Sequence, residues 1–473
     1  MTSASTMPES PPGLLIAAPN SGSGKTLVTL ALLRALRRGG TRVASLKIGP
    51  DYIDPAFHGA ASGRACLNFD GWAMRAATRG GVLQRLSQDA DLLIGEGVMG
   101  LFDGGPGGAG STAEAARLTG FPVVLVVDAK GMGASAGALI EGFLRHDPGF
   151  ELAGVLFNRV GGAGHARLLR EAAERAGTRC LGCLPRSTDT QLPSRHLGLV
   201  QAEEHEELET LIEAAADWLT PHIDLAGLAA LARPAALPEG LAPPPLPPLG
   251  QRIAVACDRA FAFCYDAVLH GWRSAGAEVR AFSPLADEAP APDCDAVYLP
   301  GGYPELEAGR LAANRGFLDG LRRAAADGAR VYGECGGYMV LGEGLVDADG
   351  RHHAMAGLLP LETSFANRRL HLGYRHAALL SDGPLGPAGR GYRGHEFHYA
   401  TVVREDGPPA LFRLQDAGGH AHGQAGLVRG TVAGSFVHLI DGDAAGATSI
   451  DSDDAAQQNE TRGQIGAGTA PSR

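Results

Sequence analysis

The sequence predicts an α/β protein of two domains, and three observations carry this prediction. Near the N-terminus an apolar strand, residues 14–17, runs through a Gly/Ser-rich loop into a helix. After residue 250 a second alternation of strands and helices begins, and one of its strands enters a glycine-flanked turn at Cys335. The intervening residues 233–250 are rich in proline, which sustains neither a helix nor an inner strand. A chain of 473 residues is also longer than one ordinary core accommodates.

Each domain is expected to contain strands that alternate with helices. Because helical stretches separate the strands, we predict a mostly parallel sheet covered by helices in the first domain. Its expected elements are strands 14–17, 42–47, 91–95, 122–128 and 153–158, with a helix at 25–38 after the first strand. The second domain is predicted as a further α/β sheet, with strands 252–256, 278–282, 296–299 and 330–333 and a helix near 265–275.

Composition divides the chain into five segments. The first residues are polar and lack the basic and apolar regions of a signal peptide. The C-terminal stretch is almost free of large apolar residues and cannot bury a core. The expected segments are a disordered lead 1–12, an α/β domain 13–232, a Pro-rich linker 233–250, an α/β domain 251–442 and a disordered tail 443–473.

The overall composition is that of a globular protein. Hydrophobic residues make up 45% and charged residues 20%, and no apolar run approaches the length of a membrane span. The net charge of −11 argues against nucleic acid as a partner. Seven scattered cysteines, an odd number, argue against a disulfide framework and for a reducing compartment. We therefore expect a cytoplasmic protein that binds neither membrane nor nucleic acid.

A candidate phosphate-binding loop joins the first strand to its helix. Glycines let backbone N–H groups face the phosphates of ATP, and the helix N-terminus adds positive potential. Lys25 is expected to bind the β and γ phosphates, and Thr26 to offer its hydroxyl to Mg²⁺. The strict pattern is incomplete because Pro19 replaces its first glycine, and a tight strand-to-helix turn is the alternative. The loop consists of Ser21, Gly22, Ser23, Gly24, Lys25 and Thr26.

Carboxylates that could organise the metal follow two of the expected strands. Glu96 comes directly after apolar residues, where a second acid that organises Mg²⁺ is expected. Asp51 and Asp54 follow the preceding strand and could serve metal or substrate. We assign Asp51 to the metal, and Asp54 and Asp103 to substrate binding. For Asp54 and Asp103, a role in an ordinary turn or cap is equally expected.

The turn at Cys335 has the pattern of a nucleophile elbow. Gly336 and Gly337 permit a strained turn that presents the thiol at the top of the sheet. The N-terminus of the following helix is expected to lower the pKa of the thiol. Cys335 is therefore our candidate nucleophile, and a buried inert cysteine is the alternative.

A thiol nucleophile needs a base, and three histidines are candidates. His438, at an expected strand end downstream of Cys335, is our choice, and His395 and His398 are its rivals. The backbone N–H groups of Gly301, Gly302 and Gly336 are candidates for an oxyanion hole.

Two pairs of residues also resemble metal or redox sites. His395 and His398 have metal-like spacing, yet no cysteine or further acid accompanies the cluster. Cys180 and Cys183 lack a second cysteine pair and partnering histidines, so we expect a structural role for them.

Eight motifs occur in order along the chain, from about residue 14 to residue 438. They lie at residues 21–26, 47–55, 97–104, 192–199, 282–285, 301–305, 334–337 and 394–399. Together they resemble the cobyrinic acid or hydrogenobyrinic acid a,c-diamide synthase family of the cobalamin (vitamin B12) pathway. The resemblance implies a dethiobiotin-synthetase-like first domain that binds ATP, Mg²⁺ and a corrin. It also implies a class I glutamine amidotransferase domain of flavodoxin-like topology.

The resemblance further implies the site residues of a ligase. Cys335 and His438 would form the glutaminase pair. Class I enzymes usually have a glutamate two residues beyond this histidine, where this chain has Ile440. The family resembled commonly lacks that glutamate as well, so a dyad is expected, and the sequence identifies no third orienting group.

The implied reaction joins the two domains. ATP phosphorylates a carboxylate of the corrin, glutamine hydrolysis releases ammonia, and ammonia displaces the phosphate to leave an amide. The a and c carboxylates are amidated in turn. Arg195 and His196 are candidates to hold the corrin carboxylates, as are Arg368, Arg369 and Arg375. Corrin, ATP and glutamine would be the only partners implied, apart from a possible homodimer.

Three alternatives stay open at this point. Cobyric acid synthase and the nickel-sirohydrochlorin a,c-diamide synthase share the two-domain plan. Residues 47–55 and 192–199 favour the a,c-diamide enzyme over cobyric acid synthase, but they do not separate it from the nickel enzyme. The alternative of another class is a P-loop regulatory ATPase with a degenerate amidotransferase domain. The intact Cys335 and His438 argue against it, as does Asn20, because such ATPases usually carry a lysine there.

Overall fold

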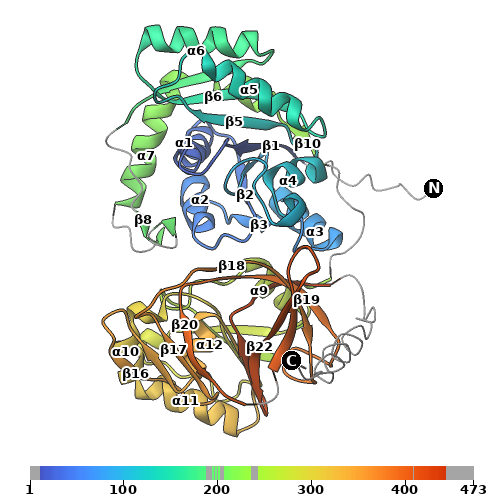
Figure 1. Ribbon diagram of the computed structural model, residues 1–473, viewed down its shortest axis with the longest axis vertical. Coiled ribbons are helices and arrows are strands. Elements are labelled where there is room, and N and C mark those ends of the chain that lie inside the picture. The colour runs from blue at the N-terminus through green and yellow to red at the C-terminus, as the bar shows by residue number, and fades with distance from the viewer. Residues whose placement is uncertain are drawn as a thin grey trace, which may run out of the picture.

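The chain folds into two α/β domains, as the sequence predicts (Figure 1). The computed structural model describes residues 11–187, 194–195, 198–199, 201–202, 207–235, 243–407 and 410–443. Among these residues no helix is long and apolar enough to cross a membrane.

A parallel sheet of strand order β3-β2-β4-β1-β5-β6-β7 forms the centre of the first domain. Its strands are β1 (Pro12–Ala17), β2 (Val43–Ile48), β3 (Leu67–Phe69), β4 (Leu92–Glu96), β5 (Val123–Asp128), β6 (Leu152–Val160) and β7 (Cys180–Pro185). The carboxyl ends of parallel strands meet at one edge of a sheet. The loops that follow β1, β2 and β4 therefore gather there, and these loops carry the phosphate-binding motif and the predicted carboxylates.

Helices cover both faces of this sheet. Along β1, Leu14 and Ile16 pack with one set of helices, whereas Leu15 and Ala17 pack with the other, as the two-residue period of a strand requires. The first set is α1 (Lys25–Arg38), α2 (Asp54–Ser62) and α7 (Leu208–Leu219). The second set is α3 (Ala76–Ser87), α4 (Thr112–Thr119), α5 (Ser135–His146) and α6 (Ala163–Arg175). Two small elements complete the domain, the hairpin β8 (Ser194–Arg195) with β9 (Gly198–Leu199), and α8 (Leu225–Ala229).

The second domain contains a ten-stranded mixed sheet. Its parallel half is β12 (Glu278–Phe282), β11 (Arg252–Ala256), β13 (Ala296–Leu299), β14 (Arg330–Glu334) and β23 (Val432–Ser435). Its antiparallel half is β22 (Ala421–Arg429), β21 (Ala410–Gln415), β18 (His371–Leu379), β19 (Gly391–His398) and β24 (His438–Gly442). The helices are α9 (Asp266–Ser274), α10 (Ala308–Ala313), α11 (Arg315–Ala326) and α12 (Gly336–Leu341). A smaller sheet contains β16 (His352–Ala354), β15 (Gly344–Val346), β17 (Leu361–Ser364) and β20 (Thr401–Glu405).

Three ends of the expected segments need correction. Pro12, expected in the disordered lead, begins β1 because its neighbours continue the buried strand. The first two residues of the expected linker form β10 (Arg233–Pro234), which pairs antiparallel with the start of β1. Asp443, expected in the tail, accepts a hydrogen bond of 2.7 Å from His376. Most of the expected lead and tail lies outside the described residues.

The two domains meet through specific polar contacts. Arg75 donates to Asp441 from its backbone N–H and its guanidinium, with atoms 2.6 to 2.9 Å apart. The hydroxyl of Tyr374 donates to Asp70 Oδ2 at 2.7 Å, and Arg393 donates to the carbonyl of Trp72 at 2.8 Å. Strands β18 and β19, which carry Tyr374 and Arg393, lie on the side of the second domain that faces the first (Figure 1).

Breaking the Arg75–Asp441 pair should destabilise the docked domains. The carboxylate of Asp441 is fully buried, so Asp441→Ala removes a desolvated partner of Arg75. We expect the free energy of unfolding to fall by about 3 kcal/mol, measured by urea denaturation. Arg145→Ala is the control because it removes an exposed pair with Glu141, and we expect a change of about 0.5 kcal/mol or less. Equal effects of the two variants would contradict this account of the interface.

Candidate active site

The phosphate-binding motif forms a loop that requires the positive φ angles of glycine at two positions. Gly22 and Gly24 have φ values of 82° and 86°, and a Cβ on Gly24 would lie 2.3 Å from Nδ2 of Asn158. Asn158 donates to the carbonyl of Ser23 at 2.9 Å, and Arg159 donates to the carbonyl of Gly22 at 3.0 Å. Two residues of β6 thus hold the loop carbonyls, as a loop whose N–H groups receive an anion requires.

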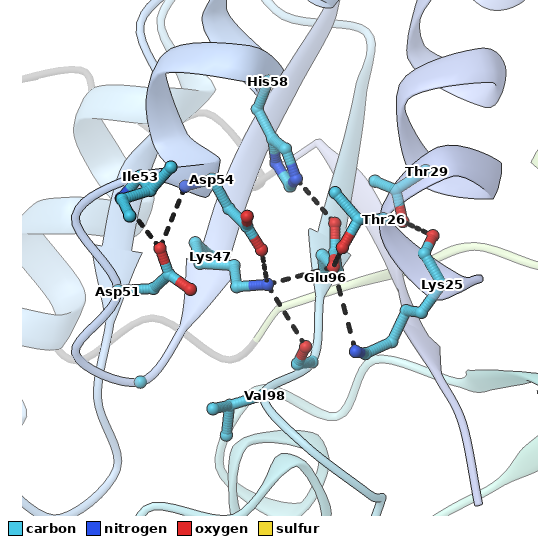
Figure 2. Close-up of polar contacts among 12 residues, drawn as sticks. Lys25, Thr26, Thr29, Lys47, Asp51, Ile53, Asp54, His58, Glu96 and Val98 are labelled. Atoms are coloured by element: carbon cyan, nitrogen blue, oxygen red, sulfur yellow. Dashed lines mark hydrogen bonds and ion pairs between the residues drawn. The ribbon is translucent and has the colours of Figure 1, made fainter. Parts of the chain in front are cut away.

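Glu96 is the centre of a buried polar cluster at the start of α1 (Figure 2). It is fully buried at the end of β4, and its Oε1 accepts hydrogen bonds from Thr26 at 2.7 Å and from Lys47 at 3.0 Å. Its Oε2 is hydrogen-bonded to His58 Nε2 at 2.7 Å, and Lys25 Nζ lies 3.8 Å from Oε1. One carboxylate therefore connects the phosphate loop, β2 and α2.

The charges of the cluster compensate one another. Burial alone would raise the pKa of Glu96, but Lys47, His58 and Lys25 outweigh burial and hold it well below its usual range. Burial disfavours the charged form of His58, yet Cys66 and Glu96 raise its pKa to about 10. Burial lowers the pKa of Lys25, because it penalises the ammonium more than the nearby carboxylates favour it. Lys25, whose ammonium is disfavoured by burial and lies 3.8 Å from Glu96, is the cation of the cluster that a phosphate would stabilise.

Asp54, rather than Asp51, lies within this cluster. Lys47 donates a short hydrogen bond to Asp54, which is buried at the first position of α2 (Figure 2). Asp51 instead caps the turn before α2, and its Oδ1 accepts from the N–H groups of Ile53 and Asp54 at 2.9 Å. Burial and the neighbouring Asp51 raise the pKa of Asp54. Asp103, an expected substrate ligand, is exposed and accepts from the N–H of Gly100 at 2.9 Å, which is a turn role.

The oxygen donors at the cluster fit a hard cation. Thr26 offers a hydroxyl, and Glu96 and Asp54 offer carboxylates, all connected through hydrogen bonds. Mg²⁺ is usually held by one or two protein carboxylates together with phosphates of the substrate. In the described part of the chain, no three His, Cys, Asp or Glu side chains are arranged to hold a metal by themselves. The donor set therefore suits a metal that arrives with a nucleotide.

The turn at Cys335 is strained in the way that a nucleophile elbow requires. Cys335 has φ 46° and ψ −102°, lies between β14 and α12, and is only 3% exposed. Its N–H donates to the carbonyl of Ser435 at 2.8 Å. A Cβ on Gly337 would lie 2.0 Å from the carbonyl oxygen of Leu299, and one on Gly336 would lie 3.0 Å from the nitrogen of Gly302. The glycines after Cys335 therefore allow the helix to approach the strand ends closely.

His438 packs directly against the predicted oxyanion glycines. A Cβ on Gly301 would lie 2.3 Å from Cε1 of His438, so only glycine leaves room for this ring. His438 begins β24, and its ring stacks on that of His395 with centroids 5.0 Å apart. Burial and, to a smaller extent, His395 lower the pKa of His438 well below its usual value. His398, the other rival, stacks on Phe436 with ring centroids 4.0 Å apart.

A pocket of about 580 Å³ lies between the two domains. The first domain lines it with Asp51, Tyr52 and Val98 among others. The second domain contributes Tyr374, Arg375, Phe397, His395 and His438 among others. The same pocket therefore reaches both the loop before α2 and the histidine beside Gly301. Arg375 gives the pocket wall a buried positive charge, since the residue is 6% exposed and pairs with Glu396 at 2.6 Å.

Comparison with known proteins connects both halves to one enzyme family. Residues 14–200 match the CobQ/CobB/MinD/ParA nucleotide binding domain, and residues 252–445 match the CobB/CobQ-like glutamine amidotransferase domain. A hydrogenobyrinate a,c-diamide synthase of Brucella anthropi is 54% identical, over 91% of this chain and 98% of that protein. The enzyme of the same name from Rhodobacter capsulatus is 54% identical, over 92% of this chain and all of that protein. The Rhizobium meliloti enzyme is 52% identical, over 91% of this chain and 99% of that protein.

The chain belongs to the hydrogenobyrinate a,c-diamide synthase family. This membership confirms the resemblance that the eight ordered motifs indicated, the order of the two domains and the class of glutamine-dependent amidotransferase. It also assigns a nucleotide to the first domain, where the Glu96 cluster lies.

In this member of the family, several predicted residues lie away from the pocket or outside the described residues. Arg368 and Arg369 are exposed, while His196 and the side chain of Arg195 lie outside the described residues. Cys180 and Cys183 lie in β7 with Sγ atoms 3.7 Å apart, and the described residues include no metal-binding group around them.

Four residues near the candidate sites of this diamide synthase family member had no role predicted from the sequence. Lys47, Tyr52 and Glu334 lie in the motifs at 47–55 and 334–337 but had no predicted role, and His58 lies outside every motif. Lys47 could have been found, because a lysine at the end of a buried strand is uncommon unless it is paired. Nothing in the local sequence shows that His58 and Glu96 meet, since this contact depends on the packing of α2 against β4.

The pKa expected for the thiol of Cys335 is wrong. The helix N-terminus was expected to lower it, and the N–H of Gly336 does act in that direction. Burial is the largest contribution, however, and together with Glu305, Glu334 and Glu396 it raises the pKa of Cys335. Near neutral pH the thiol of Cys335 and the imidazole of His438 are therefore both uncharged.

This difference predicts slow alkylation of Cys335 in the free enzyme. Iodoacetamide reacts with the thiolate, and a raised pKa lowers the thiolate fraction at a given pH. We expect the rate at Cys335 to keep rising beyond about pH 9, the ordinary range of a thiol, whereas the exposed Cys257 serves as the internal comparison. Peptide mass spectrometry measures both sites in one sample. A plateau at Cys335 below about pH 8 would show instead an ion pair with His438.

Proposed function

We propose that this protein amidates the a and c carboxylates of hydrogenobyrinic acid, using ATP and glutamine. The names of the relatives support the substrate, and cobyrinic acid is the alternative corrin. The observation that carries the proposal is the interdomain pocket of about 580 Å³ lined by both Asp51 and His438. A pocket shared by both domains suits a reaction in which one domain supplies ammonia to the other. The need for ATP and glutamine also fits a cytoplasmic location.

The first domain is proposed to activate the corrin carboxylate. A carboxylate oxygen attacks the γ phosphorus of ATP, which forms an acyl phosphate and releases ADP. Lys25, at the start of α1, and Lys47, beside Glu96, place positive charge where charge develops on the transferred phosphoryl group. Ammonia then attacks the acyl carbon, and phosphate leaves to give the amide.

Thr26, Glu96 and Asp54 are proposed to hold the Mg²⁺ that accompanies ATP. When bound, this ion neutralises charge on the phosphates. Compared with the assignment made from sequence, Asp54 and Asp51 exchange roles. Asp54 shares Lys47 with Glu96, whereas Asp51 faces the pocket and is proposed to contact the corrin side.

The second domain is proposed to release ammonia from glutamine. His438 accepts the proton of the Cys335 thiol, and the sulfur attacks the amide carbon of glutamine. The N–H groups of Gly301, Gly302 and Gly336 are proposed to stabilise the oxyanion. His438 returns the proton to the leaving nitrogen, and water then hydrolyses the γ-glutamyl thioester to glutamate.

Arg375 is proposed as the residue that binds a carboxylate in the pocket. It is buried, it lines the pocket, and Glu396 fixes its guanidinium from one side. The corrin carries several carboxylates, and a buried guanidinium binds such a group through paired hydrogen bonds.

A substrate panel with free ammonia as nitrogen source tests the corrin assignment without the glutaminase step. Hydrogenobyrinic acid, cobyrinic acid and nickel sirohydrochlorin are supplied in turn with ATP, and products are identified by mass spectrometry. We expect a diamide from hydrogenobyrinic acid with the highest kcat/KM of the three. Preferred conversion of nickel sirohydrochlorin would overturn the substrate assignment and leave the two-domain chemistry in place.

A further inference from the structure

Glu334 connects the chain segments that carry the two residues of the proposed glutaminase pair. It is the last residue of β14, directly before Cys335, and it is 1% exposed. Its Oε1 accepts a hydrogen bond of 3.2 Å from the N–H of Leu439, the residue after His438. Its Oε2 accepts a hydrogen bond of 2.8 Å from the hydroxyl of Tyr298. The residue directly before Cys335 is thus hydrogen-bonded to the residue directly after His438.

The main sheet does not hold β14 and β24 together directly. Strand β14 pairs with β13 and β23, whereas β24 pairs with β19 at the far end of the antiparallel half. The ladder holds Ser435, three residues before His438, beside Glu334, and the side chain of Glu334 adds a contact beyond this pair, to the start of β24. The distance between the thiol and the imidazole depends on how these two segments are placed.

His438 has no acidic partner among the described residues. Its Nδ1 is buried and makes no hydrogen bond within the described part of the chain, and Ile440 occupies the position two residues beyond it. Its ring is held by packing against Gly301 and by stacking on His395. With no carboxylate to orient the ring, the place of His438 relative to Cys335 depends on the backbone contacts around it, which are the β19–β24 ladder and the hydrogen bond from Leu439 to Glu334.

We propose that Glu334 is the positioning residue of the glutaminase pair. Its carboxyl group anchors the N–H of Leu439 and so holds His438 at a fixed place relative to Cys335. Glu334 touches neither glutamine nor the reacting sulfur in this role. The inference rests on the proposed roles of Cys335 and His438, and it supplies the third group that a Cys-His pair without an adjacent acid requires.

The environment of Glu334 is compatible with a neighbouring thiolate. Burial, the largest contribution, raises the pKa of Glu334 to about 8, although hydrogen bonds from Tyr298 and Leu439 act in the opposite direction. Near neutral pH the group is therefore mostly protonated, and its charge contributes to the raised pKa of Cys335 only as it ionises at higher pH. An oxygen of the neutral carboxyl group can still accept from the N–H of Leu439.

Three variants separate positioning from ordinary stabilisation. Wild type and Cys335→Ala first establish Cys335-dependent glutaminase activity. Glu334→Ala should lower the glutaminase kcat by about 30-fold while KM for glutamine changes by less than about 3-fold, because misplaced reacting groups cost rate rather than binding. Glu334→Gln keeps an oxygen that accepts from Leu439, so its kcat should return to within about 3-fold of wild type. Tyr298→Phe removes the hydrogen bond to Oε2 of Glu334 but leaves the one from Leu439, so it is the matched control, with an expected change of less than about 3-fold.

Ammonia-driven amidation shows whether the rest of the enzyme is intact. We expect it to remain within about 2-fold of wild type in all three variants, because the first domain does not use Glu334. A wild-type kcat in Glu334→Ala would overturn the inference, as would an equal loss in Glu334→Gln or a parallel loss of ammonia-driven amidation. If glutaminase activity did not depend on Cys335 at all, the proposed function of the second domain would fail, and the inference with it.

Discussion

Glu96→Gln is expected to abolish amidation with either nitrogen source. The amide keeps the size of the side chain but loses the negative charge that faces Lys25, Lys47 and His58. These cations would then repel one another, and the proposed metal would lose a carboxylate ligand. We expect kcat for amidation to fall by about 10³-fold, with glutamine or with free ammonia, while the glutaminase activity of the second domain persists.

The matched control for this change lies just before the same strand. Asp91 is an exposed acid just before β4, and its partner Arg42 is exposed as well, so Asp91→Asn makes the same change in charge at the opposite end of the strand. Amidation should stay within about 2-fold of wild type in Asp91→Asn. Near-normal amidation by Glu96→Gln, in a variant that unfolds at the wild-type temperature, would contradict the assigned role of the Glu96 cluster.

Cys335→Ala is expected to separate the two nitrogen sources. Without the thiol no thioester forms, so the glutamine-driven reaction should fall by at least about 10³-fold. The ammonia-driven reaction should stay within about 2-fold of wild type, because the first domain and its cluster are unchanged. Product formation is measured by chromatography of the corrin with each nitrogen source.

Another cysteine of the same domain provides the control for this variant. Cys294 is half-buried and packs at the edge of the second domain's core, so Cys294→Ala removes a thiol without touching the elbow. It should use both nitrogen sources like wild type. If Cys294→Ala lost glutamine-driven synthesis as fully as Cys335→Ala, the nucleophile would be wrongly assigned.

Local sequence patterns predicted most of the parallel strands of both domains, but not β3, β7 or β23. The helix predicted at 25–38 coincides with α1, and the strands predicted at 252–256, 278–282 and 296–299 coincide with β11, β12 and β13. These elements are continuous apolar runs or follow clear glycine signals, so their limits depend on nearby residues.

The antiparallel half of the second sheet was not predicted. Its strands include β18 and β22, which contain charged and small residues and are partly exposed along their length. Their pairing depends on partners that are distant in sequence, as when β19 pairs with β24. Such pairing has no local signal, and for the same reason the sequence could not place His395 beside His438.

The sequence predicted which main residues form the candidate site, but not their pKa values or the contacts that depend on burial. Lys25, Thr26 and Glu96 meet because the loops after β1 and β4 emerge at the same sheet edge, and the sequence indicated this by placing both motifs after expected strands. The raised pKa of Cys335 and the anchoring of Leu439 by Glu334 depend on burial by the whole second domain. Neither follows from the residues adjacent to the elbow.

The transfer of nitrogen from glutamine to the corrin tests the central claim most directly. Wild-type enzyme is supplied with hydrogenobyrinic acid, ATP and glutamine labelled with ¹⁵N in its amide group, and the product is analysed by mass spectrometry. We predict a diamide that carries the label in both new amide groups when wild type is used, and no labelled product with Cys335→Ala. A wild-type enzyme that consumes glutamine and ATP but leaves the corrin unlabelled would contradict the account.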